Sequence, residues 1–429
     1  METKKYPNIL IIGTCPYTKN GPTRSFETYF GSWPSNNLAQ FFSQEIIPTE
    51  RQCSTLFRIT DRELVKNRFN SFAVGTIFDD RFLSTQTTAP SKIGKTSIWK
   101  LMVNLVSRHK SPFTHMIRKR IWKEELWNTA KFNNWLESFS PNVVFCSFSN
   151  DFFILEISEY VSHKFSIPII CAIDDDYLFG RSFLASPCSL IYKQKYSKLA
   201  KRVIKDSSSL IFISDKMKTK YCKALNVSGT TMYLSSELQP KMLSPTIPSN
   251  ISYFGNLRLD RYKSLCDIAS QLEIINPQLF IDVYSSEHSK KILSAFAKFK
   301  NIRFHGFVPY QKLTKIMMDS DILLICEAQR GKFVQEVAYS LSTKVADSVS
   351  SGIPIFAYGS KNAGAIDFLL QKNLACVATN PNELGEKLKR ILNDASYRKE
   401  LSAKCLAFAK PNFNHDLNNQ KFYELVTRL

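Results

Sequence analysis

Short, continuous runs of apolar residues recur along the chain, and each is followed by a longer stretch with helical spacing of its apolar positions. Such runs are typical of strands buried on both faces of a parallel sheet, and their alternation with helices indicates a doubly wound α/β domain. The first run is Asn8–Gly13, whereas 31–90 predicts only short strands near 55–59 and 73–78. Later strands are expected at 143–148, 167–173 and 210–214, with helices at 152–163, 190–204 and 215–225.

The alternation starts again after a Ser/Pro-rich stretch at 235–250, which we interpret as a linker between two domains. A second parallel sheet is predicted from six apolar runs, at 251–254, 280–284, 302–305, 322–326, 353–358 and 375–378. Helices at 381–394, 396–409 and 414–428 close the chain. The pattern therefore divides the chain into residues 1–240, 250–395 and 396–429.

One stretch of the second domain, Ser340–Gly359, reads as a short helix, a glycine stop and a buried strand. Ser342 and Thr343 can cap the helix, so Lys344 and Asp347 fall in its first turns. Free N–H groups at a helix start attract anions, and a lysine with two hydroxyls beside them suits a diphosphate. The alternative is an ordinary helix–turn–strand unit without a ligand.

Two glycine-containing loops follow the first predicted strand of each domain. In the first, Gly21 and Thr23 precede Arg24 at a helix start, and in the second, Gly255 leads into a helix with Arg261. Loops at the carboxyl ends of such strands commonly contact ligands in open α/β sheets, and an arginine there can meet a phosphate. The first loop lacks the GxGxxG pattern of a dinucleotide site. A surface loop with a solvated arginine is the alternative for the first.

Three carboxylates follow the strand at 167–173, namely Asp174, Asp175 and Asp176, and Tyr177 comes next. Packing explains such a cluster poorly, because like charges repel and burial disfavours them. The cluster suits general-base work, metal binding or hydrogen bonds to sugar hydroxyls. The alternative is a solvated acidic turn.

The net charge of +20 requires an explanation, and nucleic acid, an anionic membrane and anionic substrates are the partners to consider. Residues 92–135 combine many cations with four of the five tryptophans, which predicts an amphipathic segment lying on an anionic membrane. The alternatives are helices that dock their tryptophans onto the domain, or a nucleic-acid surface. The segment contains Lys92, Lys95, Trp99, Lys100, Arg108, Lys110, Arg118, Lys119, Arg120, Trp122, Lys123, Trp127, Lys131 and Trp135.

The ten cysteines are scattered without a CxxC pair, and the six histidines are equally dispersed. This pattern predicts buried thiols in a reducing compartment and neither a disulfide framework nor a zinc site. No apolar run approaches the length needed to span a bilayer, and the N-terminal segment lacks the features of a signal peptide.

Three stretches resemble the GT-B glycosyltransferases, specifically the retaining, family-four-like bacterial enzymes that build surface polysaccharides. GNLRLDRYKSL, starting at Gly255, is similar to the family's Gly-x-Leu…Lys segment, with Arg261 at the place of the cation that contacts the donor diphosphate. FHGFVPYQKLTKIMMDSDILLI, at 304–325, resembles a second family segment. Ser340–Gly359 resembles TK-x-x-E-Y-L-A-x-G-x-P, with Lys344 at the lysine and Asp347 at the acidic residue that holds the donor ribose.

The resemblance implies an α/β GT-B fold, in which two Rossmann-like domains face a cleft and C-terminal helices pack back toward the N-terminal domain. It implies that residues 1–240 bind the acceptor and residues 250–395 the nucleotide sugar. A sugar, a hexose or a related one, would pass to an acceptor hydroxyl with retention, without a metal or another cofactor. The acceptor would be a lipid-linked saccharide, and the enzyme would be cytoplasmic and peripheral on the inner face of the plasma membrane.

The implied donor residues are Gly255, Arg261, Ser342, Thr343, Lys344 and Asp347. Asp174 and Asp175 are the catalytic candidates, and Gly21, Thr23, Arg24, Asp176 and Tyr177 would contact the acceptor or a phosphate.

The chain departs from the family pattern at three places. The family has two glutamates eight residues apart, but here Tyr339 takes the first place and Asp347 the second. Many relatives carry His-Asp where this chain has Asp174-Asp175, so an imidazole role is replaced by a carboxylate that would act as base or bind the acceptor. These departures leave open a non-catalytic GT-B-like subunit that binds a partner transferase. A basic nucleic-acid-binding protein, an epimerase and a sugar-phosphate-forming enzyme are further alternatives.

Overall fold

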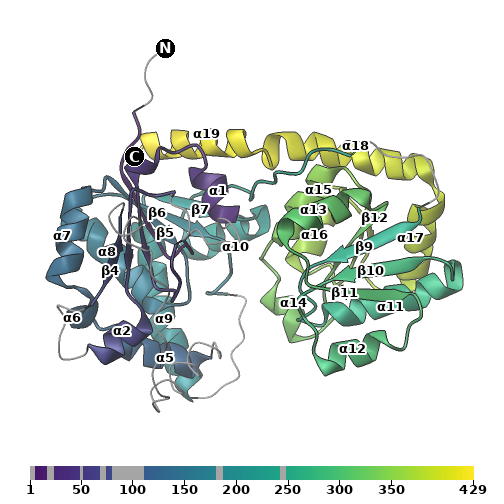
Figure 1. Cartoon of the computed structure of the whole chain (residues 1–429), viewed down its shortest axis with the longest axis horizontal. Coiled ribbons are helices and arrows are strands. Elements are labelled where there is room, and N and C mark those ends of the chain that lie inside the picture. Colours follow the sequence, from purple (N-terminus) through teal and green to yellow (C-terminus); the bar gives the residue numbers. More distant parts are fainter. Residues whose placement is uncertain are drawn as a thin grey trace, which may run out of the picture.

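The computed structural model describes residues 5–16, 24–48, 52–67, 74–79, 111–179, 187–241 and 248–429. Within this part of the chain, the strands form two separate sheets, one from residues 9–231 and one from residues 250–378 (Figure 1). Helices flank each sheet, so the predicted α/β class is confirmed.

The N-terminal sheet has eight strands among the described residues. These are β1 (Ile9–Ile12), β2 (Leu38–Phe42), β3 (Thr55–Arg58), β4 (Thr76–Phe78), β5 (Val143–Ser147), β6 (Ile169–Ile173), β7 (Ser209–Phe212) and β8 (Thr230–Thr231). Their order is β4-β3-β2-β1-β5-β6-β7-β8, and all neighbours are parallel except β3 and β4. The strand order reverses between β1 and β5, which is where doubly wound sheets bind their ligands.

The helices of this half follow the strands as the sequence pattern predicts, with somewhat different bounds. They are α1 (Arg24–Phe30), the short 3-10 helix η1 (Ser35–Asn37), α2 (Asp61–Lys66), α5 (Pro112–Ile121), α6 (Glu124–Trp127), α7 (Ala130–Phe139), α8 (Phe152–Phe165), α9 (Pro187–Asp206) and α10 (Asp215–Leu225). Side-chain caps fix several of their starts, as at Ser214, whose hydroxyl accepts a hydrogen bond from the N–H of Met217.

The C-terminal sheet has six strands, all parallel, in the order β11-β10-β9-β12-β13-β14 among the described residues. Its switch point lies between β9 and β12. The strands are β9 (Asn250–Phe254), β10 (Phe280–Tyr284), β11 (Ile302–Gly306), β12 (Ile322–Cys326), β13 (Ile355–Tyr358) and β14 (Cys376–Ala378). The helices are α11 (Arg261–Ile275), α12 (Lys290–Phe296), α13 (Tyr310–Asp319), α14 (Lys332–Glu336), α15 (Thr343–Ser351), α16 (Gly364–Gln371) and α17 (Pro381–Asn393).

Two final helices, α18 (Ala395–Asn412) and α19 (His415–Thr427), lead the chain back from the second domain to the first (Figure 1). Phe422 of α19 is fully buried in the aromatic cluster around Tyr29 and Phe145 of the first domain. Asn419 donates a hydrogen bond to the carbonyl of Glu27 on α1. The predicted return of the C-terminal helices to the N-terminal domain is confirmed.

The tryptophans of α5, α6 and α7 correct one expectation. Trp122, Trp127 and Trp135 are all at most 4% exposed, and Trp122 stacks on Phe153 of α8 at 3.7 Å between ring centroids. Rings packed in the core in this way cannot enter a lipid headgroup layer, so the role predicted for these three is wrong. Trp99 and the cations of 92–110 lie outside the described residues.

The sequence pattern also missed the strand β2. Its burial is continuous, but Gln40 interrupts the apolar run, and the surrounding segment shows no clear period. The buried amide of Gln40 donates to the carbonyl of Thr14, which satisfies the polar group inside the sheet. A strand with one hydrogen-bonded polar side chain therefore escaped a search based on apolar runs.

Candidate active site

A buried ion pair stands at the switch point of the C-terminal sheet. Arg261 begins α11, and its Nε and Nη2 donate to the two carboxylate oxygens of Glu327 at 2.8 and 3.0 Å. Glu327 follows directly after β12, and the two side chains are 12% and 5% exposed. The pair uses two nitrogens of the guanidinium, and Nη1 makes no hydrogen bond to the described residues. This nitrogen is the one left to meet an anion.

Lys344 lies beside that pair and is largely buried. Its Nζ sits 5.0 Å from the ring centroid of Tyr253 and 3.4 Å from the phenolic oxygen. The pKa of Lys344 is lowered to about 8, mainly by burial and secondly by the positive charge of Arg261, while the charge of Glu327 opposes the shift. An anionic ligand at this place would favour the charged form of the lysine and raise its pKa again.

Gly255 provides the room that Lys344 occupies. It has φ +128, and a Cβ at this position would overlap Nζ and lie 2.6 Å from Cε of Lys344. A residue with a side chain would therefore be strained and would displace the lysine. Thus the structure brings together three predicted donor residues from two separate stretches, Gly255 and Arg261 from the first and Lys344 from the second.

The start of α15 has the predicted form but not the predicted caps. Ser342 is the N-cap residue, yet its side chain makes no capping hydrogen bond, and Gly352 ends the helix with φ +69. The hydroxyls of Ser342 and Thr343 make no hydrogen bond to the described residues. They and the helix-start N–H groups are therefore available to a ligand.

Asp347 contacts the other domain. Its carboxylate accepts Nη1 and Nη2 of Arg24 at 2.6 and 2.8 Å and the hydroxyl of Ser236 at 2.7 Å. Arg24 also donates to the hydroxyl of Tyr310 and to the carbonyl of Thr343. The expectation that Arg24 meets a phosphate is thus replaced in this structure by an ion pair with the predicted ribose ligand. Gly21 and Thr23 of the same loop lie outside the described residues.

The three aspartates after β6 point in different directions. Asp175 is exposed, and its carboxylate accepts hydrogen bonds from Tyr177 at 3.1 Å and from Ser340 of the other domain at 3.1 Å. The acidic strand end and the Ser340–Gly359 stretch therefore meet across the domain interface, as Asp347 and Arg24 do.

Asp174 faces the first domain. It accepts a hydrogen bond from Ser25 at 3.2 Å, while its Oδ1 is buried without a partner among the described residues. Burial raises the pKa of Asp174 to about 6; the Ser25 hydroxyl opposes this rise and the charge of Asp175 adds to it.

Asp176 requires a correction. It is 4% exposed, and its Oδ1 accepts hydrogen bonds from the N–H groups of Leu178 and Phe179 and from the hydroxyl of Tyr221 at 2.7 Å. A carboxylate held in this way shapes the loop and is turned away from an acceptor. Of the three aspartates, Asp175 is the one placed to contact a substrate.

Sequence reasoning missed Glu327, Ser236 and Tyr310. Glu327 carried a signal, because an acidic residue directly after an apolar strand lies at the ligand-binding edge of a parallel sheet. Ser236 and Tyr310 carried none, since their contacts to Asp347 and Arg24 depend on how the two domains dock. No group of three or more metal-ligating side chains gathers in the part of the chain that the structure describes.

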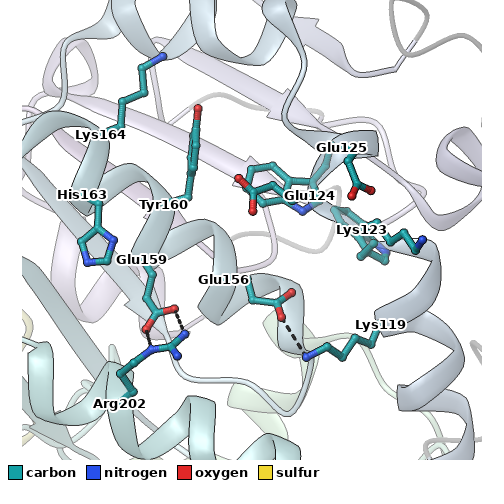
Figure 2. Close-up of a pocket in the computed structure, with 12 residues that line it drawn as sticks. Lys119, Lys123, Glu124, Glu125, Glu156, Glu159, Tyr160, His163, Lys164 and Arg202 are labelled. Atoms are coloured by element: carbon teal, nitrogen blue, oxygen red, sulfur yellow. Dashed lines mark hydrogen bonds and ion pairs between the residues drawn. The ribbon is translucent and has the colours of Figure 1, made fainter.

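A pocket of about 820 Å³ lies elsewhere, between α5, α6, α8 and α9 of the first domain (Figure 2). Two ion pairs join charged residues of its lining. Figure 2 shows Glu156 with Lys119 and Glu159 with Arg202, at 3.2 and 2.6 Å. None of the predicted site residues lines it, so it is not part of the candidate active site.

Comparisons with known proteins bear on the fold and on the second domain. Residues 265–419 match a family model described as glycosyl transferase-like. No curated protein matches the sequence. No helix of the described residues is long and apolar enough to cross a bilayer.

Solved structures cover the whole chain. HepE of Anabaena, in complex with UDP and glucose, has a TM-score of 0.61 at 12% identity, over 99% of this chain and 100% of its own. Sucrose-phosphate synthase of Thermosynechococcus elongatus has a TM-score of 0.61 at 10% identity, over 99% of each chain. TarM of S. aureus reaches 0.52 at 12% identity, over 68% of this chain and 57% of its own. The protein therefore has the GT-B fold, and residues 265–419 of its second half match a glycosyl transferase-like domain.

Proposed function

We propose that this glycosyltransferase moves a sugar, a hexose or a related one, from a nucleoside-diphosphate donor to a hydroxyl of a lipid-linked saccharide, with retention at the anomeric carbon. The observation that carries the proposal is the convergence of Arg261, Lys344 and the start of α15 at the switch point of the C-terminal sheet. Bacterial surface polysaccharide assembly at the inner face of the plasma membrane is the setting we propose for it.

The cationic cluster suits the departing nucleoside diphosphate. Negative charge grows on the diphosphate as the sugar leaves, and fixed donors that already face this place stabilise it without reorganising. Nη1 of Arg261, Nζ of Lys344 and the N–H groups and hydroxyls at Ser342 and Thr343 supply such donors. Because side chains supply this positive charge, we expect transfer to proceed without a divalent cation.

Asp347 is the proposed partner of the donor ribose. A carboxylate has about four acceptor positions. Arg24 and Ser236 fill three of them in this structure. A ribose diol needs two, so it would displace Ser236 or one arm of Arg24. Donor binding and the contact between the domains are therefore coupled at this carboxylate.

On the acceptor side, Asp175 is the proposed catalytic or acceptor-binding carboxylate. It is exposed, it faces Ser340 at the domain interface, and Tyr177 holds its second oxygen. A carboxylate so placed can accept the proton or the hydrogen bond of an acceptor hydroxyl. Asp174 stands behind it as a positioning residue.

Structural neighbours support the donor class. HepE has been solved with UDP and glucose and with UDP-glucose, and TarM with UDP. These ligands were bound to HepE and TarM and not to this protein. The base and the sugar that this chain takes are left for a screen of nucleotide sugars to identify.

The test is a donor screen read by release of nucleoside diphosphate in the presence of lipid-linked saccharides, with and without EDTA. We expect one donor class to be turned over. Asp175→Asn should lower turnover at least about tenfold while leaving donor affinity unchanged. A protein that binds a donor but never turns it over with any acceptor would instead be a non-catalytic partner subunit. Unchanged turnover in Asp175→Asn would remove Asp175 from the mechanism.

A further inference from the structure

Helix α9 has two unlike faces. Its buried face is built from aromatic and aliphatic residues, among them Tyr192 and Tyr196, which stack at 5.5 Å between ring centroids. Its exposed residues include six cations, of which Arg202 is paired with Glu159 of α8, and, within the helix, a single acidic residue, Asp206. The cations are Lys193, Lys195, Lys198, Lys201, Arg202 and Lys205.

An apolar tip adjoins the beginning of this face. Leu190 and Ile191, the fourth and fifth residues of α9, are 61% and 47% exposed, and Phe113, in the first turn of α5, is 62% exposed. The N-terminal halves of α5 and α9 pack against each other, since the rings of His115 and Tyr192 are 5.4 Å apart. Leu190 also lines the groove described below, so this apolar pair directly adjoins the lysines of α9.

The tip lies at the same edge of the sheet as the candidate active site. The hydroxyls of Tyr192 and Tyr196 donate to the carbonyls of Asn150 and Ser149, which follow the carboxyl end of β5. The start of α9 is therefore at the carboxyl edge of the N-terminal sheet, where Asp175 follows β6. In Figure 1, α5 and α9 lie at the end of the first domain opposite to α19.

A groove of about 430 Å³ runs along the exposed face of α9. It is lined by Leu190, Lys193, Gln194, Ser197, Lys198 and Lys201, and no carboxylate is among its lining residues. The pocket of Figure 2 is different, because glutamates line it and two of them pair with its cations Lys119 and Arg202. The groove therefore keeps its positive charge for an outside partner.

We propose that the apolar tip and the basic face of α9 form the surface with which this protein sits on an anionic phospholipid membrane. The proposal builds on the proposed lipid-linked acceptor and moves the membrane contact from the tryptophans to α9. The argument is charge complementarity joined to apolar side chains at one end: cations attract phosphate headgroups, and the tip enters the acyl boundary. A nucleic acid would bind the cations, but its phosphates would not cover the apolar side chains of Leu190 and Ile191.

The experiment is sedimentation of the full chain with vesicles of phosphatidylcholine alone or mixed with phosphatidylglycerol. Wild-type protein should pellet with the mixed vesicles and stay in solution with the neutral ones. K193Q/K198Q/K201Q should lower the partition coefficient about 100-fold, because each cation near an anionic surface contributes about fivefold. F113S/L190S/I191S should weaken binding and make the remainder fully sensitive to salt.

K290Q/K298Q/K300Q is the matched control, since it removes three exposed lysines from the second domain and should bind vesicles like wild type. Equal pelleting with both vesicle types, or α9 variants that bind like this control, would overturn the proposal. Tighter binding to duplex DNA than to the mixed vesicles, lost in the same α9 variant, would overturn it in favour of nucleic acid. Binding of nucleoside diphosphate, titrated on the same samples, reports separately on the proposed transferase.

Discussion

Arg24 of α1 and Asp347 of α15 form a two-pronged ion pair between the domains, with N–O distances of 2.6 and 2.8 Å. The side chains are 19% and 8% exposed, so the pair is shielded from solvent. The carboxylate proposed for the donor ribose is thus occupied by an arginine of the opposite domain. This arrangement joins donor binding to the contact between the domains.

Substitution of Arg24 and substitution of Asp347 should change donor affinity in different ways. Arg24→Gln should free Asp347 for the ribose, so donor affinity should stay or rise while kcat falls about tenfold because closure is weakened. Asp347→Asn should weaken donor affinity about 10- to 100-fold. Calorimetric titration with the donor and steady-state kinetics separate the two effects. Weaker diphosphate binding by Arg24→Gln would restore the phosphate role that the sequence suggested.

Removal of the carboxylate of Glu327 should disturb the donor site through Arg261. Glu327→Gln loses the charge that orients the guanidinium, so we expect KM for the donor to rise about tenfold with a smaller change in kcat. It also removes a negative charge that raises the pKa of Lys344. The pH above which donor affinity falls should therefore be lower in this variant than in wild type. A purely structural role would leave that pH profile in place. Glu400→Gln, at a surface pair with Lys404, is the control.

The sequence contained most of the fold because the strands at the centre of each sheet are continuous apolar runs. The run in β1, with all four residues fully buried, is one example. The burial of Trp122 was not predictable in the same way, since basic residues mixed with tryptophan have the same spacing whether the rings face lipid or the core. Only the tertiary contact with Phe153 decides it.

The candidate site also contains residues that local sequence predicts and residues that only the tertiary structure brings together. Gly255, Arg261 and Lys344 follow from helix and strand ends, because the edge of a parallel sheet brings such ends together. The pairing of Arg24 with Asp347 depends on the docking of two domains, which no local pattern encodes. The role of Asp176 could not be predicted either. Three adjacent aspartates look equivalent in sequence, yet Asp176 alone accepts a hydrogen bond from the buried Tyr221.

Donor binding should depend on the protonation of Lys344. Its pKa of about 8 in the free protein means that the lysine is mostly charged at pH 7 and mostly neutral at pH 9. A diphosphate favours the charged form, so affinity should be flat at lower pH and fall up to tenfold per pH unit above 8. Calorimetry in buffers of different ionisation enthalpy should detect proton uptake near pH 8. Lys344→Met should bind weakly at every pH and take up no proton.

Ionisation of Asp174 should cost stability. Because its pKa is raised from 3.8 to about 6, the folded state holds this proton more tightly than the unfolded state does. The contribution of this group therefore falls as pH rises from about 4 to 6, by about 3 kcal/mol at most. Asp174→Asn lacks this loss, so its Tm relative to wild type should rise between pH 4 and pH 7. Parallel thermal unfolding curves at both pH values would show that Asp174 ionises normally.

Two glycine substitutions separate backbone strain from the loss of the lysine site. Gly255 and Gly331 both have positive φ, +128 and +87, but only at Gly255 would a Cβ meet Lys344; at Gly331 nothing lies within 4 Å. Both alanine variants should lose about 1 kcal/mol of stability from strain. Gly255→Ala should also weaken nucleoside-diphosphate binding at least about tenfold, because the ammonium must leave its place beside Arg261. If Gly331→Ala weakened binding equally, strain would explain the effect and the position of Lys344 would not. If Gly255→Ala bound normally, the diphosphate would have to lie away from the gap between β9 and α15.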